Sequence, residues 1–337
     1  NKSSNLMLVT ILQKSAIFAL VAVSMNLVNG FTGLFSLGQA GFMSIGAYVT
    51  AILTIPLASR PTVYYLVDEL NPIVQNVQLP FPVAIILGGL IAAFFAALIG
   101  IPVLRLKSDY LAIATLGFSE IIRALINSQQ LQSLTNGSYG LNQIPALDST
   151  VQIFFIVGVC IAIMVLVLRS SYGRAFKAIR EDEIAAEAMG INLFKHKEMA
   201  FVISSFFTAI GGGLLAMFMR SVSADTFKIA MTYDVLLIVV IGGMGSVTGS
   251  ILSSFLVTAS KEWWLTFLDK PLTLFGWQVP LFKTGFRMVV FSVLLMVVVL
   301  FYRKGLMGNR EFSWDAVARF PRKIASLFRR KKKEEVL

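Results

Sequence analysis

The feature of this sequence that most restricts its fold is a series of apolar runs long enough to cross a bilayer. A helical crossing takes about 20 predominantly apolar residues. Six runs have this character: 9–28, 81–104, 109–127, 151–168, 198–219 and 282–302. Apolar residues make up 56% of the 337 residues and charged residues 14%, against about 25% charged in soluble domains. The sequence therefore predicts an all-α, polytopic membrane protein and excludes a soluble enzyme, a disordered chain and a coiled coil.

Two further apolar regions, 31–57 and 232–268, are too long for a single crossing, and glycines interrupt both. Loops that stay in the cytoplasm carry an excess of Lys and Arg. The strongly basic segments are Arg105–Ser108, the long charged loop 169–198 and the tail 303–337. An even number of crossings must separate these segments if all are cytoplasmic. We therefore expect 232–268 to cross twice, with a break at Gly242–Gly245.

The same count applies to the start of the chain. If the N-terminus is cytoplasmic, 31–57 also crosses twice, with a break at Gly38–Gly41. The first run is expected to be a retained helix rather than a signal peptide, because no small-residue cleavage pattern accompanies it. The prediction is a transmembrane domain, 1–302, of about eight to ten segments, followed by a basic cytoplasmic tail, 303–337. Short, glycine-interrupted segments at similar places in two halves are typical of a repeat around a substrate path.

The excess of positive charge is concentrated in the tail. The chain has 29 Lys and Arg against 18 Asp and Glu, and residues 303–335 alone carry 11 basic and 4 acidic side chains. In a membrane protein such a tail is typical of attraction to anionic lipid headgroups. No aromatic or glycine-rich recognition segment accompanies it, so nucleic acid is not expected as a partner.

The sequence lacks the groups that common enzyme and metal sites need. Its one cysteine, Cys160, excludes an intrachain disulfide, and with only one histidine, His196, a metal site of His and Cys is not expected. The motif Gly-x-x-x-x-Gly-Lys-Ser/Thr is missing, so the chain cannot hold ATP in a phosphate-binding loop. We expect a non-enzymatic protein without a cofactor of its own, driven by another chain or by an ion gradient.

One stretch of the long charged loop is typical of a short amphipathic helix. Residues 171–190 are rich in Ala, Glu, Lys and Arg, which favour a helix, and apolar side chains recur among them near helical spacing. Gly190 is a natural residue at which such a helix ends. Three interpretations are open: a solvated connection, a helix on the lipid surface, or a docking helix for a cytoplasmic partner.

Within this loop, Arg180–Asn192 resembles the cytoplasmic loop of the LivM-type permeases, which are membrane subunits of ABC importers for branched-chain amino acids. Further strings resemble the same family in the same order: Asn26–Gly30, Gly33–Phe42, Leu104–Leu106, Asp109–Phe118 and Ile241–Ser246. The resemblance covers roughly 15–305 and implies a helix bundle like those of the ribose and vitamin B12 permeases. It also implies that the loop 169–198 forms a coupling helix that sits in a groove of an ATPase subunit.

The resemblance implies partners and a location as well. A second, LivH-like permease would enclose the path, and two cytoplasmic ATPases would bind ATP and Mg²⁺. An extracytoplasmic binding protein would deliver leucine, isoleucine or valine, at the plasma membrane of a bacterium or archaeon. Similar permeases carry urea, amides or other amino acids, so these substrates stay open. A self-contained ion-coupled carrier or channel would need titratable groups in the membrane, and Glu120 with Asp234 is a thin supply.

The resemblance places candidate docking residues in the loop. Ala185, Ala186 and Gly190 match the family's coupling pattern Glu-Ala-Ala-x-x-x-Gly, while Ile184 stands where the pattern has Glu. The predicted ATPase-docking residues are Arg174, Arg180, Glu183, Ala185, Ala186, Glu187 and Gly190. Charges among them are expected to set the register of docking across the rim of the interface.

A second candidate set consists of polar residues inside the predicted spans and of glycines at the two breaks. The predicted path residues are Asn26, Asn29, Gln39, Gly41, Thr115, Ser119, Glu120, Gly242 and Gly243. Plainer interpretations stand beside this one. Glycines let helices pack closely, hydroxyls bond back to helix carbonyls, and Glu120 and Arg123 pair locally at i and i+3.

Overall fold

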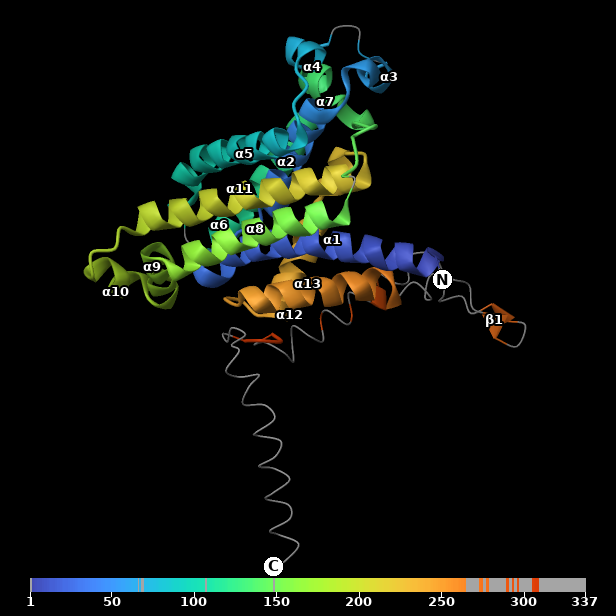
Figure 1. Ribbon diagram of the computed structural model, residues 1–337. Coiled ribbons are helices and arrows are strands. Elements are labelled where there is room, and N and C mark those ends of the chain that lie inside the picture. The colour runs from blue at the N-terminus through green and yellow to red at the C-terminus, as the bar shows by residue number, and fades with distance from the viewer. Residues whose placement is uncertain are drawn as a thin grey trace, which may run out of the picture.

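The computed structural model describes residues 2–65, 67, 70–106, 108–147 and 149–264, with 273–274, 277–278, 289–290, 293, 296 and 305–308. The predicted span 282–302 and the tail 303–337 lie almost entirely outside these residues. The long helices are α1 (Lys2–Asn26), α2 (Gln39–Thr54), α5 (Phe81–Val103), α6 (Ser108–Ile126), α8 (Thr150–Arg169), α11 (Leu193–Met219), α12 (Ile229–Gly242) and α13 (Val247–Glu262). They pack into one helix bundle (Figure 1).

Short elements join the long helices. A π-helical turn, η1 (Leu27–Phe31), continues α1. The other short helices are η2 (Leu57–Ser59), α3 (Arg60–Val63), α4 (Pro72–Asn76), η3 (Gln129–Leu131), α7 (Gln132–Thr135), η4 (Gly137–Tyr139), α9 (Ser171–Glu181), α10 (Glu183–Ala188) and η5 (Ala224–Phe227). Two strands, β1 (Thr273–Leu274) and β2 (Trp277–Gln278), pair antiparallel.

Within the described residues, four helices are long and apolar enough to cross a membrane: Met7–Phe31, Phe81–Val103, Thr150–Arg169 and Leu193–Met219. Two further pairs of helices reach the length and apolar character of a membrane span only when they are taken together. They are α2 with 57–63, bent by 98°, and α6 with 129–135, bent by 58°. At 14 residues and 1.5 Å per residue, α12 is shorter than the ~30 Å hydrocarbon core. The prediction of a polytopic helical membrane protein is confirmed, as is the short first half of 232–268.

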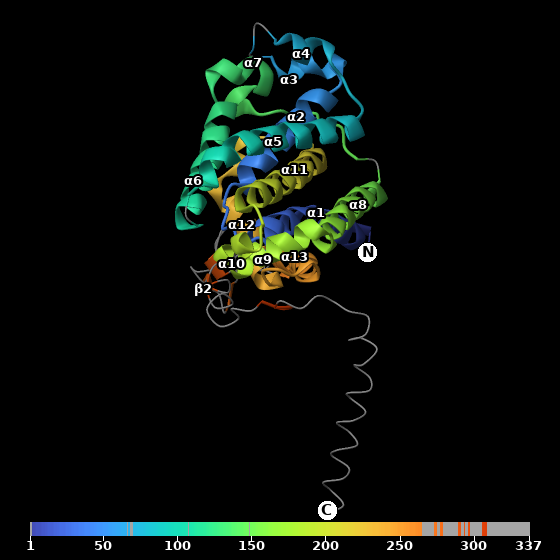
Figure 2. The same cartoon turned by 90° about the vertical axis from the view of Figure 1, so that its left-hand side faces the viewer.

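Helix α11 lies at the centre of the bundle. It lies between α5 and α1, with α13 beyond α1 (Figures 1 and 2), and it packs most extensively on α2 and α5. A Cβ added at Gly46 of α2 would lie 2.0 Å from the carbonyl oxygen of Ala209, and one at Gly212 would lie 2.0 Å from that of Met43. Small residues permit such close backbone contact between membrane helices. The packing interpretation of glycine is therefore confirmed at this helix pair.

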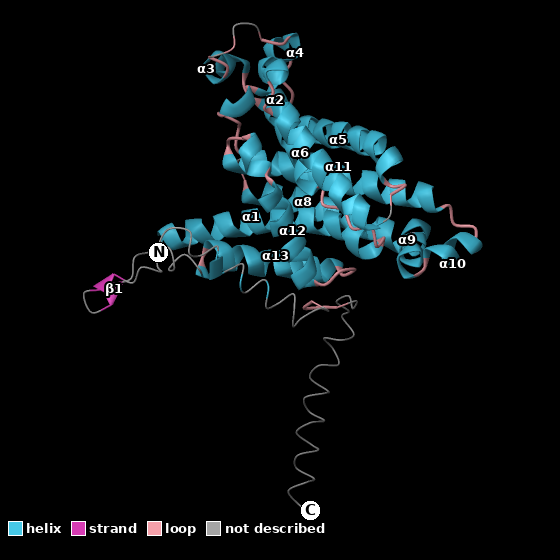
Figure 3. Cartoon of the chain, turned by 180° about the vertical axis from the view of Figure 1, so that it is seen from behind, coloured by secondary structure: helices cyan, strands magenta, loops and turns pink. Residues whose placement is uncertain are grey.

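The first turns of α1 lie at the end of the bundle opposite α9 and α10 (Figures 1 and 3). We call these two ends the opposite end and the α9 end. At the opposite end, Gln13 donates to the hydroxyl of Thr150 at 2.7 Å, and Lys14 pairs with Glu262 at 2.6 Å. The start of α1 therefore lies at the end of the bundle opposite the basic loop 169–198, which does not favour the condition of a cytoplasmic N-terminus.

Region 31–57 passes through the bundle once and not twice. Residues 32–38 are non-helical, and the single helix α2 follows them. Side chains hold this backbone: the Asn29 amide donates to the carbonyl of Ser36 at 3.1 Å and accepts its N–H at 3.2 Å. The hydroxyl of Thr115 accepts the N–H of Leu37 at 2.9 Å. Irregular backbone persists inside a membrane bundle only where such internal partners satisfy it.

The break predicted at Gly242–Gly245 is confirmed. Helix α12 ends at Gly242 and α13 begins at Val247. Gly243 and Gly245 between them have φ values of 108° and 89°, which residues with a side chain rarely adopt. Ser246 then caps α13 by accepting the N–H of Gly249 at 3.1 Å.

Candidate functional site

The charged loop forms two short helices, which corrects the single helix predicted over 171–190. Helix α9 ends at Glu181, and Asp182 adopts an extended conformation with φ −158° and ψ 112°. The Asp182 carboxylate accepts the N–H groups of Ile184 at 2.8 Å and Ala185 at 3.1 Å, which caps α10. The change of direction at Asp182 places α10 at the tip of the α9 end (Figure 1).

Helix α10 ends where the sequence indicated. Gly190 has φ +83°, and its N–H donates to the carbonyl of Glu187 at 2.9 Å. The N–H of Ile191 donates to the carbonyl of Ala186 at 3.1 Å. This pair of bonds is the Schellman arrangement, in which a left-handed residue, usually glycine, follows the last helical turn. The predicted helix end is confirmed, and a side chain at Gly190 would strain it.

Helices α9 and α10 border a surface hollow of about 540 Å³. Met189, the residue that follows the last turn of α10, lines this hollow and is 83% exposed. Ile184 lies in the first turn of α10 and is 82% exposed. Exposed apolar side chains beside a hollow are a candidate site of interaction with a partner. The sequence had indicated Ile184 only as a departure from the family pattern, and it had not singled out Met189. Their exposure is what indicates a docking role, and the exposure of a side chain is known only from the fold.

Five of the predicted docking residues lie on the exposed surface. They are Arg174, Glu183, Ala185, Glu187 and Gly190, of which Arg174 and Ala185 line the hollow. Ala186 differs, because it is only 4% exposed and packs towards the bundle. Ala186 nevertheless lines the hollow together with Arg174 and Ala185, whereas Glu187 and Gly190 lie outside its lining.

Two predicted docking charges are engaged within the chain. Glu183 pairs with Lys197 of α11 at 2.6 Å. Arg180 points into the bundle, where its Nη1 donates to the carbonyl oxygen of Gly30 in η1 at 3.0 Å. A Cβ added at Gly245 would lie 2.7 Å from the same nitrogen. Arg180 therefore lies between the end of α1 and the α12–α13 break, while its Nη2 pairs with exposed Glu181, which lines the hollow. Its role in docking stays a prediction.

Asn26, predicted as a path residue, binds the same break from inside the bundle. Its side chain is fully buried. The Nδ2 group donates to the carbonyl of Ser246 at 2.9 Å and to the hydroxyl of Ser250 at 2.8 Å, and Oδ1 accepts the N–H of Gly245 at 2.8 Å. These bonds occupy the amide and hold the end of α1 against the start of α13.

The predicted path residues of α2 and α6 are also buried and engaged. Gln39 accepts the hydroxyl of Thr208 at 2.6 Å, and its amide donates to Ser204 at 3.4 Å. Gly41 lies against α6, because a Cβ there would lie 2.8 Å from the Cα of Ser119. Gln39 is 2% exposed and Ser119 is 3% exposed. In this conformation they belong to the packed interior, so their place on a substrate path stays a prediction.

The remaining path residues lie at helix contacts or in a local ion pair. A Cβ at Gly242 would lie 2.6 Å from the carbonyl carbon of Gly249 in α13, so this glycine serves close packing. Glu120 pairs with Arg123 at 2.6 Å, and Arg123 approaches Asp225 at 3.9 Å. The local i, i+3 pair is confirmed. Among the described residues, no group of three or more His, Cys, Asp or Glu is arranged to hold a metal ion.

Comparison with known proteins places the chain in a family. The family described as branched-chain amino acid transport system / permease component matches residues 7–311. The chain belongs to this permease family. The high-affinity branched-chain amino acid transport system permease protein LivM of Salmonella typhimurium is 33% identical over 302 residues, which are 80% of this chain and 66% of that protein. LivM of Escherichia coli K12 is 33% identical over 294 residues, 77% of this chain and 64% of that protein.

The chain thus spans slightly less than two thirds of the length of these two LivM permeases. The permease LivH of Salmonella typhimurium is 23% identical over 309 residues, 87% of this chain and 92% of that protein. No solved structure matches the chain, so its likeness to the ribose and vitamin B12 permeases stays a prediction. The resemblance to LivM-type permeases is confirmed. As a permease of this family with four membrane-length helices, the chain is a multi-pass membrane protein.

Proposed function

We propose that this chain is one membrane subunit of an ATP-driven ABC importer for leucine, isoleucine and valine. The chain is the non-enzymatic gate, and two cytoplasmic ATPases bind ATP and Mg²⁺. A second, related permease completes the path, and an extracytoplasmic binding protein delivers substrate at the opposite end. The chain lies in a bacterial or archaeal plasma membrane, with the loop 169–198 and the tail 303–337 in the cytoplasm.

The α9–α10 surface is the observation that carries the proposal. It combines a hollow of about 540 Å³ with exposed Ile184 and Met189 at the tip of the bundle. Large apolar side chains that enter a partner's pocket supply much of the binding energy of an interface. Charges at the rim, here Arg174 and Glu187, favour one register. A loop with two capped helices supports docking better than it supports a solvated connection.

Movement of an ATPase docked at this surface would be passed to the bundle through two contacts. Arg180 of α9 binds the carbonyl of Gly30 at the end of α1. Glu183 of α10 pairs with Lys197 of α11. Movement of an ATPase bound to α9 and α10 would therefore displace α1 and α11.

The names of the relatives support the substrate class, because LivM and LivH are both called branched-chain amino acid transport permeases. The contacts of the titratable groups do not favour a self-contained ion-coupled carrier. Glu120 pairs with Arg123 at 2.6 Å, and Asp234 pairs with Lys261 at 2.5 Å. Each carboxylate thus has a basic partner, whereas a coupling group must exchange its ion or proton during transport.

Co-purification tests the docking surface. Ile184→Asp combined with Met189→Asp places charge where apolar contact is expected, so the ATPase recovered with the permease should fall at least about tenfold. Tyr139→Asp is the control, because Tyr139 is 60% exposed in η4, away from the α9–α10 surface. This control should recover as much ATPase as the wild type. Undiminished association of the double variant would remove the docking assignment.

Reconstituted uptake tests the function as a whole. Leucine uptake should require the second permease, the ATPases, the binding protein and ATP hydrolysis. Isoleucine and valine should compete with leucine, and stronger competition by urea, an amide or another amino acid would reassign the substrate. Uptake by this chain alone, without ATP, would contradict the importer and support a self-contained carrier.

A further inference from the structure

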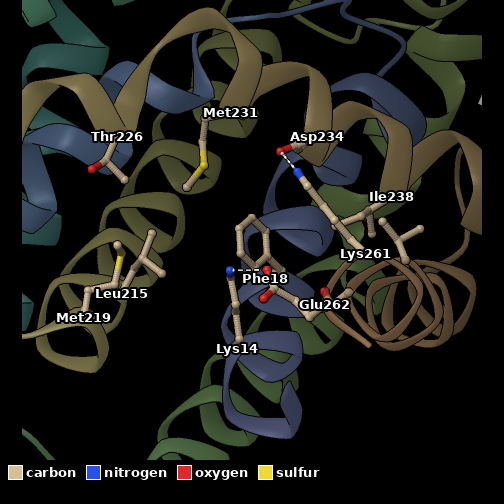
Figure 4. A pocket seen from close by; sticks show the side chains of 12 residues that line it. Lys14, Phe18, Leu215, Met219, Thr226, Met231, Asp234, Ile238, Lys261 and Glu262 are labelled. Carbon is tan, nitrogen blue, oxygen red and sulfur yellow. Dashed lines mark hydrogen bonds and ion pairs between the residues drawn. The ribbon is translucent and has the colours of Figure 1, made fainter. Parts of the chain in front are cut away.

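A hollow of about 270 Å³ lies among α1, α11, α12 and α13 at the opposite end of the bundle (Figure 4). Two ion pairs border it. Lys14 of α1 pairs with Glu262 of α13 at 2.6 Å, and Lys261 of α13 pairs with Asp234 of α12 at 2.5 Å. The four side chains are 28–36% exposed, so their charged groups border the hollow without being sealed in the core.

The rest of the wall is mainly apolar. The apolar lining residues are Phe18, Leu215, Met219, Met231, Ile238 and Val257. Figure 4 shows the ring of Phe18 beside both ion pairs, with Leu215 and Met219 of α11 across the hollow. The site therefore combines charges of both signs with an apolar surface that continues directly from them.

Helix packing alone does not account for these charges. Charged side chains in membrane helices are costly, and those that are kept usually mark a pathway for a substrate or an ion. The same two helices, α1 and α13, are joined at the α9 end by uncharged groups, the amide of Asn26 with Ser246 and Ser250. Four charges gathered at one hollow, two of each sign, thus point to a ligand that carries both signs.

We propose that this hollow binds one neutral aliphatic amino acid as its zwitterion. Asp234 and Glu262 supply carboxylates for the ammonium group. Lys14 and Lys261 supply the opposite charges for the carboxylate of the ligand. The aliphatic side chain packs against Phe18 and the other apolar lining residues. The substrate class rests on the proposed function, and the hollow gives that substrate a binding site within this subunit.

Charge and size determine which ligands fit. Because the four side chains sum to zero charge, a zwitterion enters without leaving an uncompensated charge, whereas a cation or an anion does not. A polar side chain would lose its hydration against the apolar wall, which costs free energy. A volume of about 270 Å³ lies just below the ~300–1,000 Å³ of pockets for drug-sized ligands, which suits one small amino acid.

The first test measures binding of radiolabelled leucine to the purified chain in lipid nanodiscs. Saturable binding is expected. Leucinamide lacks the carboxylate and 4-methylpentanoate lacks the ammonium group, so each should compete at least about tenfold more weakly than leucine. The proposal is overturned if leucine does not bind, or if either analogue competes as well as leucine. This comparison does not depend on the folding of any variant.

The second test removes one ion pair without leaving an unpaired charge. Asp234→Asn combined with Lys261→Gln should weaken leucine binding at least about tenfold. The matched control is Asp225→Asn combined with Lys228→Gln, a more exposed pair of 3.1 Å whose side chains do not line the hollow. It should bind leucine as the wild type does. Wild-type affinity in the first variant overturns the proposal, even if its thermal stability falls.

Two further measurements separate the remaining outcomes. Glycerophosphoethanolamine carries the ammonium and the anion of a zwitterionic lipid headgroup, and displacement of leucine by it as effectively as by leucine would make the hollow a lipid site and overturn the proposal. ATP-driven uptake by the assembled importer is measured with the same variants. Equal uptake by wild type and Asp234→Asn/Lys261→Gln refutes the hollow and leaves the proposed function standing. Leucine binding without ATP-driven uptake refutes the function and leaves the hollow standing.

Discussion

At the scale of single residues, Asn26 holds irregular backbone in the interior of the bundle. Its amide binds Ser246, Ser250 and the N–H of Gly245 across the α12–α13 break. Asn26→Leu should lower stability, because each buried polar group left without a partner costs about 1–3 kcal/mol. We expect the thermal midpoint of the purified protein to fall by roughly 5 °C or more, as measured by intrinsic fluorescence.

Asn76→Leu provides the matched control, because the Asn76 amide bonds to the carbonyl of Pro72 at 3.2 Å in the exposed helix α4. Its midpoint should stay close to that of the wild type. An Asn26→Leu protein as stable as the wild type would mean that the break holds without this amide. The amide would then be free to serve a substrate path, as the sequence had predicted.

The sequence placed Asn26 inside the bundle but could not supply the partners of its side chain. Asn26 in an apolar run must meet polar groups, yet its partner Ser250 lies 224 residues away along the chain. Arg180 shows the opposite difficulty. Its basic surroundings predicted an outward position, but the carbonyl of Gly30 at the end of the π-helical turn binds it. Such a carbonyl has no signature in a local sequence pattern.

At the scale of elements, α9 connects the exposed surface with the interior. Phe176 and Ile179 bury its inner face, at 0% and 2% exposed. Lys177 lies 5.7 Å from the centre of the Phe31 ring, and Arg180 binds Gly30 at 3.0 Å. Because both contacts reach the π-helical turn η1, which continues α1, α9 cannot shift without displacing the end of α1.

Arg180→Met should therefore uncouple a bound ATPase from transport. The substitution removes the bond to Gly30 and the ion pair with Glu181, and it leaves the exposed Ile184 and Met189 in place. We expect ATPase association to be unchanged and ATP-driven uptake to fall about tenfold, an effect near 1.4 kcal/mol. Lys195→Met, at an exposed position of the same end, is the control for loss of positive charge. Loss of ATPase association in Arg180→Met would return Arg180 to the docking rim.

The element boundaries show what a local pattern can determine. The ends of α10 and α12 were predicted, because Gly190 and Gly243 meet a purely local need for positive φ. The break at Asp182 was missed, since Ala and Glu around it favour one continuous helix, although Asp is a strong N-cap residue. The sequence did not predict the non-helical stretch 32–38, because its backbone depends on a partner in another helix. The hydroxyl of Thr115 in α6 accepts the N–H of Leu37.

At the scale of the whole molecule, α1 joins the two sites that we propose. Lys14 borders the hollow at the opposite end, and Gly30 receives Arg180 at the α9 end. One helix thus touches both the place assigned to the substrate and the place assigned to the ATPase. A change in either site can reach the other through a displacement of α1, without a chain of many intermediate side chains. This arrangement requires the two ends to face opposite sides of the membrane.

That orientation predicts which positions react with a membrane-impermeant thiol reagent. Cys160 is the one cysteine of the sequence, so Cys160→Ser gives a cysteine-free background. Tyr139→Cys should be labelled in intact cells, and Met189→Cys only after permeabilisation, because the basic α9 end is expected in the cytoplasm. The native side chains are 60% and 83% exposed, so a difference in labelling reports the side of the membrane and not burial. Labelling of Met189→Cys in intact cells would place α9 outside the cell, where no cytoplasmic ATPase can bind it, and would refute the importer.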